Sequence, residues 1–203
     1  TADVSVSGGN TGVRYYLSGG ALSQDGLRMG SSYKKVFGRI NLDAKLNDWV
    51  RANINTQVSY DATRVSPFGN NNAVGGGLAA MNAPFASPYD PNTGKELVRV
   101  PLLDIATPSH VIETNPAKTN NFILSTNGNL TITPLKNLTL RSLIGLELDY
   151  GNSRSRTLPS YYRAYGNGSS ERSFSMASNI TITNTASYNM TFGDHHLTTL
   201  LGH

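Results

Sequence analysis

The chain has 203 residues, with 17 Lys and Arg against 13 Asp and Glu, a formal net charge of +4 and no cysteine. This composition excludes collagen, coiled coils, disulfide-rich mini-proteins and thiolate metal sites. Charged residues make up 15% and hydrophobic residues 38% of the chain, and Asn, Ser, Thr and Gly fill the difference. Such a mixture favours strands and loops over helices, and the modest, scattered charge gives no indication of a nucleic acid partner.

In the first half of the chain, apolar and polar residues alternate over residues 4–6, 13–21, 36–46 and 50–60. The last of these runs is the most regular, because every even position is apolar or Thr and every odd position is polar. A period of two is the mark of a β-strand whose two faces meet different environments. Phe37 is the one exception in the third run.

The second half of the chain continues the same pattern over residues 122–132, 138–150, 174–190 and 197–202. Leu143 and Gly145 interrupt the polar face of the second of these runs. We therefore expect about eight strands, of which the first and the last are truncated.

Short and long connections alternate between these runs. Tight turns are expected at residues 8–11, 46–48, 134–137 and 193–195. Longer connections are expected around residues 24–26, from about 62 to 119, and around 154–172. Successive turns of an up-and-down antiparallel sheet lie at opposite ends, so all the long connections fall on one rim. Bacterial outer-membrane barrels have this arrangement.

The length and composition of the runs favour lipid as the environment of the apolar face. Ten steps from Val50 to Tyr60, at about 3.3 Å each and a tilt near 40°, cover roughly 25 Å along a membrane normal. The sequence contains no apolar run of about 18 residues, which excludes a membrane helix. Tyr60, Phe122, Tyr150 and Phe174 fall at the long-loop ends of their runs, as expected for an aromatic girdle.

Two sets of strand residues follow from this interpretation. The predicted lipid-facing residues are Ile40, Leu42, Val50, Ile54, Val58, Leu140, Ile144, Leu148, Ile180 and Ile182. The predicted lumen-facing residues are Arg39, Asp43, Lys45, Arg51, Arg141, Glu147 and Asp149. Charges of mixed sign can pair and stay solvated in a water-containing lumen.

No catalytic site, metal site or cofactor is expected. His195 and His196 are neighbours on a strand and point to opposite faces, which does not suit a shared metal ion. Glu147 and Asp149 have a spacing that overlaps the acid pair of inverting glycosidases, but lumen-lining carboxylates explain them equally well. If a ligand is bound, we expect it at the long loops, which combine amide and aromatic groups. The loop candidates are Asn70, Asn71, Asn72, Phe85, Tyr89, Tyr161, Tyr162 and Tyr165.

Several separate pieces of the chain form a recognisable series. In chain order they are VSVSGG at 4–9, YYLSGG at 15–20, DG at 25–26, RINLDAKLNDW at 39–49, AP at 83–84, YD at 89–90, LIG at 143–145, NTASYN at 184–189 and LLG at 200–202. These pieces resemble the barrel of TonB-dependent outer-membrane transporters of the SusC/RagA type. They span essentially the whole chain in the order of the family. The resemblance implies that residues 1–203 are part of one barrel domain, about eight strands of a 22-strand transmembrane β-barrel in the bacterial outer membrane.

The same resemblance implies the partners and the activity of the intact protein. These are an N-terminal plug absent from this sequence, energy from TonB-ExbB-ExbD through that missing part, a SusD-like surface lipoprotein, and import of glycans or peptides. Two other interpretations stay open on the sequence alone. One is a self-contained eight-stranded outer-membrane barrel acting as an adhesin or anchor; the other is a soluble all-β carbohydrate-binding module.

Overall fold

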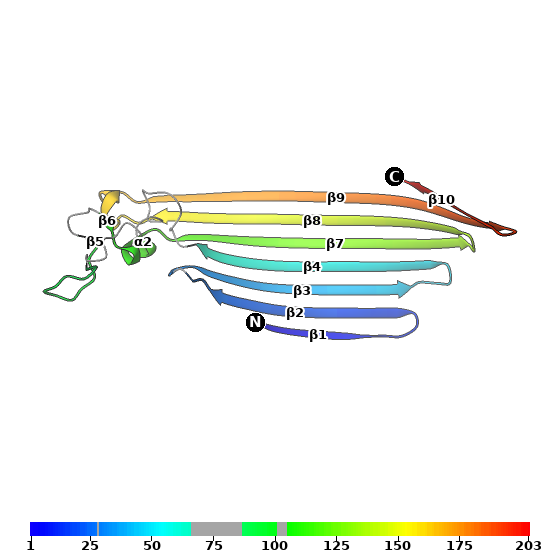
Figure 1. Cartoon of the computed structure of the whole chain (residues 1–203), viewed down its shortest axis with the longest axis horizontal. Helices are drawn as coiled ribbons and strands as arrows, with labels where there is room; N and C mark the ends of the chain where they lie inside the picture. Colours follow the sequence, from blue (N-terminus) through cyan, green and yellow to red (C-terminus); the bar gives the residue numbers. More distant parts are fainter. Residues whose placement is uncertain (28, 66–86, 101–104) are drawn as a thin grey trace.

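The main element of the protein is one antiparallel sheet of eight strands, in the order β1-β2-β3-β4-β7-β8-β9-β10 (Figure 1). The computed structural model describes residues 1–27, 29–65, 87–100 and 105–203. The strands are β1 Ala2–Gly9, β2 Val13–Asp25, β3 Ser32–Lys45, β4 Val50–Val65, β7 Ala117–Leu135, β8 Leu138–Thr157, β9 Ser169–Phe192 and β10 His195–Gly202. The predicted all-β, up-and-down arrangement of about eight strands is confirmed.

A small group of elements lies at one end of this sheet (Figure 1). It consists of β5 Arg99–Val100, β6 Ile105–Ala106, the helix α2 Pro108–Thr114 and the 3-10 turn η1 Tyr162–Ala164. We call these four elements the end cap. Among the described residues, no helix has the length and apolar character needed to cross a membrane.

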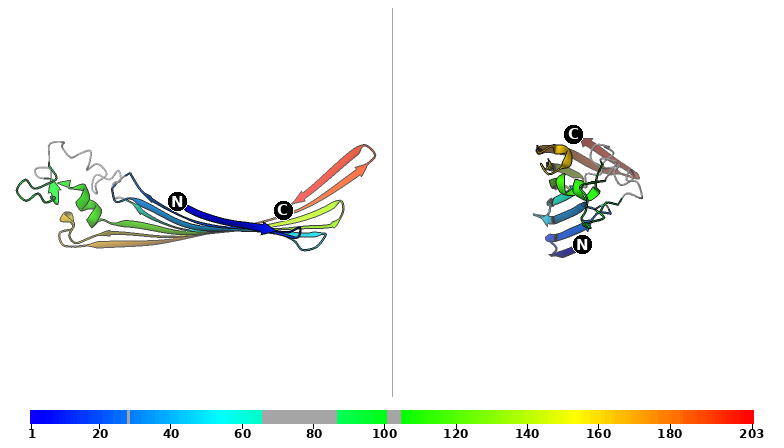
Figure 2. Two further views of the ribbon diagram at one scale, coloured as in Figure 1. Left: turned by 90° about the horizontal axis from the view of Figure 1, so that it is seen from below. Right: turned by 90° about the vertical axis from the view of Figure 1, so that its left-hand side faces the viewer.

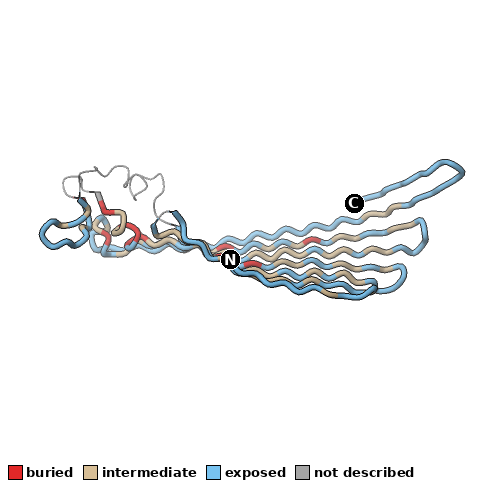
Figure 3. Tube along the Cα trace, turned by 60° about the horizontal axis from the view of Figure 1, so that its bottom comes forward, coloured by how far each residue is buried: buried red, intermediate tan, exposed pale blue. Residues whose placement is uncertain are grey.

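The sheet is a single bowed layer (Figure 2). Among the described residues, the buried apolar side chains are Val100, Ala106, Val111, Ile112 and Tyr161, which belong to the end cap or its border. The strands are intermediate or exposed over most of their length (Figure 3). A soluble sandwich would bury the inner faces of two sheets against each other. The part of the chain that the structure describes has no second large sheet that could do this, which argues against the soluble module.

The sheet is also open, because β1 and β10 are its two edges and lie far apart in Figure 1. A self-contained eight-stranded barrel would pair its first strand with its last. The alternative of a small closed barrel is therefore wrong for this fold. Both edges present unpaired backbone groups, which further strands would satisfy.

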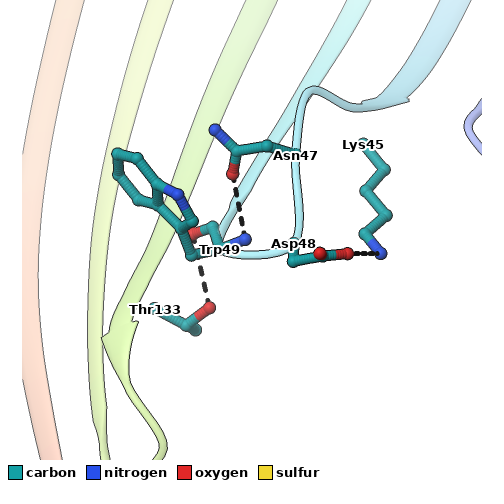
Figure 4. Close-up of polar contacts among 5 residues, drawn as sticks. All are labelled: Lys45, Asn47, Asp48, Trp49 and Thr133. Atoms are coloured by element: carbon teal, nitrogen blue, oxygen red, sulfur yellow. Dashed lines mark hydrogen bonds and ion pairs between the residues drawn. The ribbon is translucent and has the colours of Figure 1, made fainter.

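The tight turns lie where the sequence predicts them, and the β3–β4 turn is fixed by its own side chains (Figure 4). Asn47 Oδ1 accepts a hydrogen bond from the Trp49 backbone N–H at 2.9 Å. Lys45 Nζ lies 2.6 Å from Asp48 Oδ1, and Thr133 Oγ1 of β7 donates to the Trp49 carbonyl at 3.3 Å. The turn is thus joined to the neighbouring strand.

The long connections are shorter than predicted. The connection expected around 154–172 covers only residues 158–168, because β8 continues to Thr157 and β9 begins at Ser169. The connection expected to start near residue 62 starts after Val65. In the extensions of β8 and β9 the strands pair through their backbones while both faces are polar, so no period of two marks them in the sequence.

Candidate functional site

The strand register joins the alternating residues into one continuous apolar face. Across its centre, Ile54 lies opposite Gly128, Gly128 opposite Ile144, and Ile144 opposite Ile182. Because side chains alternate along each strand, every second residue from these positions lies on the same face. All ten predicted lipid-facing residues lie on it: Ile40, Leu42, Val50, Ile54, Val58, Leu140, Ile144, Leu148, Ile180 and Ile182.

No other element of the described residues covers this apolar face. Ile54 is 47%, Ile144 53% and Ile180 67% exposed. Between the register rows through Val50 and Tyr60, the strand residues on this face carry no charge. Apolar patches larger than a few hundred Å² are rare on soluble monomers and mark contact with protein or membrane.

An aromatic row borders the apolar face at the end nearer the long loops. Tyr60, Phe122 and Tyr150 are direct register partners on three adjacent strands. The ring centroid of Phe174 on β9 lies 6.3 Å from that of Tyr150. The predicted aromatic positions therefore form one line across four strands, the arrangement of an interfacial girdle.

One polar pair in the middle of the apolar face is satisfied internally. The hydroxyls of Thr56 and Thr126, on paired strands, lie 2.7 Å apart and share a hydrogen bond. A hydroxyl that finds a partner in this way avoids most of the cost of leaving water. The pair is therefore compatible with hydrocarbon surroundings.

The opposite face is polar and carries mixed charges. All seven predicted lumen-facing residues lie on it: Arg39, Asp43, Lys45, Arg51, Arg141, Glu147 and Asp149. Arg51 Nε lies 3.6 Å from Asp43 Oδ1, and Arg39 Nη2 donates to Gln57 Oε1 at 2.8 Å. These side chains are largely exposed, so the face is suited to water.

Among the loop candidates, Tyr161 and Tyr162 pack together in the end cap. Their ring centroids are 5.2 Å apart in an edge-to-face arrangement, and Tyr161 also stacks on His110 at 6.0 Å. Tyr161 is buried with Ala106 and Val111, and this burial raises the pKa of its phenol above the usual 10.0. Its position indicates a packing role within the cap.

The other loop candidates are not brought to this cluster by any contact in the described residues. Tyr89 is exposed and pairs with Glu96 in an isolated bridge, and Tyr165 is 87% exposed at the end of η1. Asn70, Asn71, Asn72 and Phe85 lie outside the described residues. Tyr89 and Tyr165 are thus the described candidates whose rings are free to meet a ligand.

The packing of His110 in the end cap is a feature that the sequence did not predict. Burial beneath Tyr161 and Tyr162 lowers the pKa of His110 below the usual 6.5, and the nearby Glu113 carboxylate partly opposes this shift. The sequence feature that could have predicted α2 is Pro108, which occupies the first turn of this helix directly after Thr107. Proline at the start of a helix is common and could have indicated α2.

Comparisons with known proteins agree with this architecture. No protein-family model matches the sequence, and no curated protein matches it. Two solved structures of the RagAB peptide importer, in its 'closed-closed' and 'open-open' states, each match 98% of this chain with a TM-score of 0.85 and 26% identity. A structure of the RagAB peptide transporter matches the same share with a TM-score of 0.86 and 26% identity.

The resemblance to SusC/RagA-type transporters is confirmed. The fold is therefore an antiparallel barrel segment. The chain spans 23% of the length of each RagAB chain that it matches. The SusC/RagA-like pieces lie in β1, β2, β3, β8, β9 and β10 and in the connections between strands, from one end of the chain to the other.

Proposed function

We propose that this chain forms part of the barrel wall of a TonB-dependent outer-membrane transporter that imports peptides. The observation that carries the proposal is the match of 98% of the chain to the RagAB peptide importer. The uncovered apolar face, its aromatic border and its polar reverse supply independent physical support.

The contribution of this segment to transport is passive. The apolar face contacts hydrocarbon, and the polar face borders a water-containing lumen in which Asp43 and Arg51 form an ion pair. Such a lumen seats a plug and gives cargo a hydrated passage. The end cap and the neighbouring loops lie at the external rim, where they contact cargo or the lid above it.

The intact protein requires partners, which we infer from the resemblance to SusC/RagA-type transporters. It receives energy from TonB-ExbB-ExbD through an N-terminal part outside this sequence, and a SusD-like surface lipoprotein covers its external opening. It moves its cargo without covalent chemistry, so it is not an enzyme. Peptides are the preferred cargo because the similar structures are those of a peptide importer.

The test uses the full-length transporter that contains this chain. Membrane fractions are extracted in detergent and run with and without boiling, and uptake of labelled peptides and labelled oligosaccharides is compared in cells with and without the transporter. We expect outer-membrane location, heat-dependent mobility and loss of peptide uptake. Recovery as a compact soluble protein would overturn the proposal, and loss of oligosaccharide uptake alone would replace the cargo by glycans.

A further inference from the structure

The outward face changes character just beyond the aromatic row. Arg64, Lys118, Arg154 and Arg172 occupy one register row across β4, β7, β8 and β9. They lie on the same side of the sheet as Tyr60, because each is an even number of residues from a position of the apolar face. We call these four residues the basic row.

Two further cations extend the basic row into a groove. Lys34 on β3 and Arg156 on β8 lie on the same side of the sheet. With Arg64, Lys118 and Arg154 they line a groove of about 470 Å³. This volume is large enough to accept an anionic group between several cations at once.

No carboxylate of the described residues neutralises the basic row. The ion pairs found in the described part of the chain are Lys45–Asp48 and Arg51–Asp43, both elsewhere on the sheet. Asp25 on β2 shares the register row, but Ser32 on β3 lies between it and Arg64 on β4. Like charges directly opposite one another on paired strands are destabilising, so a bound anion would relieve the repulsion.

Two contacts orient the Arg172 side chain for binding an anion. Its Nε donates to Asn152 Oδ1 at 3.2 Å, and its guanidinium carbon lies 4.5 Å from the Phe174 ring centroid. The guanidinium is thus stacked on a girdle aromatic, and among the described residues it makes no further hydrogen bond. Guanidinium groups bind phosphate oxygens in a forked, two-bond geometry.

The height of the basic row matches the headgroup region. Arg64 is four residues beyond Tyr60, which corresponds to roughly 10 Å along the membrane normal at about 3.3 Å per residue and a tilt near 40°. We propose that the basic row binds the phosphate groups of anionic lipid headgroups in the leaflet on the long-loop side. This inference rests on the proposed function, since it requires the apolar face to lie in a membrane.

The test compares three forms of the full-length transporter in detergent micelles that contain phosphatidic acid and phosphatidylcholine. The outward variant carries Arg64→Gln, Lys118→Gln, Arg154→Gln and Arg172→Gln. The matched control removes the same number of charges from the opposite face through Arg39→Gln, Lys45→Gln, Arg51→Gln and Arg141→Gln. Native mass spectrometry counts the lipids retained by each form.

We expect wild type and control to retain phosphatidic acid in preference to phosphatidylcholine, and the outward variant to lose about tenfold of that preference, since each basic residue near a membrane surface adds attraction for anionic lipid. Equal preference in the outward variant and wild type would overturn the inference. Displacement of phosphatidic acid by inorganic phosphate at equal concentration would overturn it too, because the site would then bind free anions.

A gel run with and without boiling shows whether a negative result contradicts only lipid binding by the basic row or the proposed membrane barrel as well. A heat-modifiable, membrane-extracted protein without lipid preference contradicts only the basic-row inference. A protein that is soluble without detergent contradicts the barrel itself. If the outward variant releases a co-purified lipoprotein while it keeps its lipid preference, the basic row is a protein interface and the lipid assignment is wrong.

Discussion

The sheet and the end cap differ in how far they bury their apolar side chains. The end cap buries Val111 completely and covers it with Ala106 and Tyr161 from separate elements. The sheet leaves Ile144 about half exposed and covers it with nothing from the described chain. The cap therefore buries its apolar side chains as a protein in water does, whereas the apolar face of the sheet fits the apolar surroundings of the proposed membrane location.

The largest effect is expected from a charge at the centre of the apolar face of the sheet. Ile144→Arg places a charge in the middle of the apolar face, and we expect a loss of about 2–4 kcal/mol in folding free energy in bilayers, because an exposed Arg near the midplane is costly. Denaturant titration of the full-length transporter in lipid vesicles measures this loss.

The adjacent residue supplies the matched control. Leu143 lies on the polar face, opposite Asn129 and Thr183. Leu143→Arg should change the folding free energy little, because its side chain reaches water. Equal effects of the two substitutions, or a neutral Ile144→Arg, would show that the two faces do not meet different solvents.

The cap should respond to the loss of packing and not to charge on an exposed face. Val111→Ala removes two methyl groups from a fully buried position, and we expect a local loss of about 2 kcal/mol, or roughly 30-fold faster hydrogen exchange at the amides of α2. Val98→Ala is the control, because Val98 is half exposed in the same region. Unchanged exchange in the Val111→Ala variant would contradict a packed cap.

The pair Thr56 and Thr126 tests how dry the apolar face is. Either Thr→Val substitution alone leaves one hydroxyl without its partner, and we expect a loss of about 1 kcal/mol in vesicles. The double variant should recover most of this loss, since no orphaned hydroxyl remains. Denaturant titrations of the four forms make a double-mutant cycle, and strictly additive losses would indicate that water reaches the pair.

The sequence predicts the sheet well and the cap poorly, for a physical reason. Ile54, Thr56 and Val58 alternate with polar residues because a strand between two solvents repeats every two residues. The contact between His110 and Tyr161 joins α2 to the distant β8–β9 connection and leaves no period in either segment. Such contacts depend on the three-dimensional path of the chain, which a linear pattern does not record.

The ends of the strands illustrate the same limit. Beyond Tyr150 and before Phe174 the paired residues are polar on both faces, so the ladder continues without an alternating signal. Arg154 and Arg172 of the basic row lie in this stretch, and Arg64 and Lys118 continue the row on β4 and β7. Its four cations are scattered along the sequence and become neighbours only through the register.

The smallest expected effect is a pH response confined to the cap. Burial lowers the pKa of His110 below 6.5, so the folded cap resists protonation that the unfolded segment accepts. The contribution of this group to stability is therefore fully present above about pH 6.5 and is lost as the pH falls through that value toward the lowered pKa. The groups facing it are Tyr161, Tyr162 and Glu113, and of these only Glu113 opposes the shift.

Hydrogen exchange at α2, corrected for the intrinsic rate, should thus show weaker protection at pH 5.5 than at pH 7.5, while the amides of β8 keep theirs. His110→Gln removes the titrating group and should abolish the difference. Stronger protection of α2 at pH 5.5 would mean that the imidazolium is favoured in the folded cap, through Glu113, and that burial beneath the two tyrosines does not govern the site.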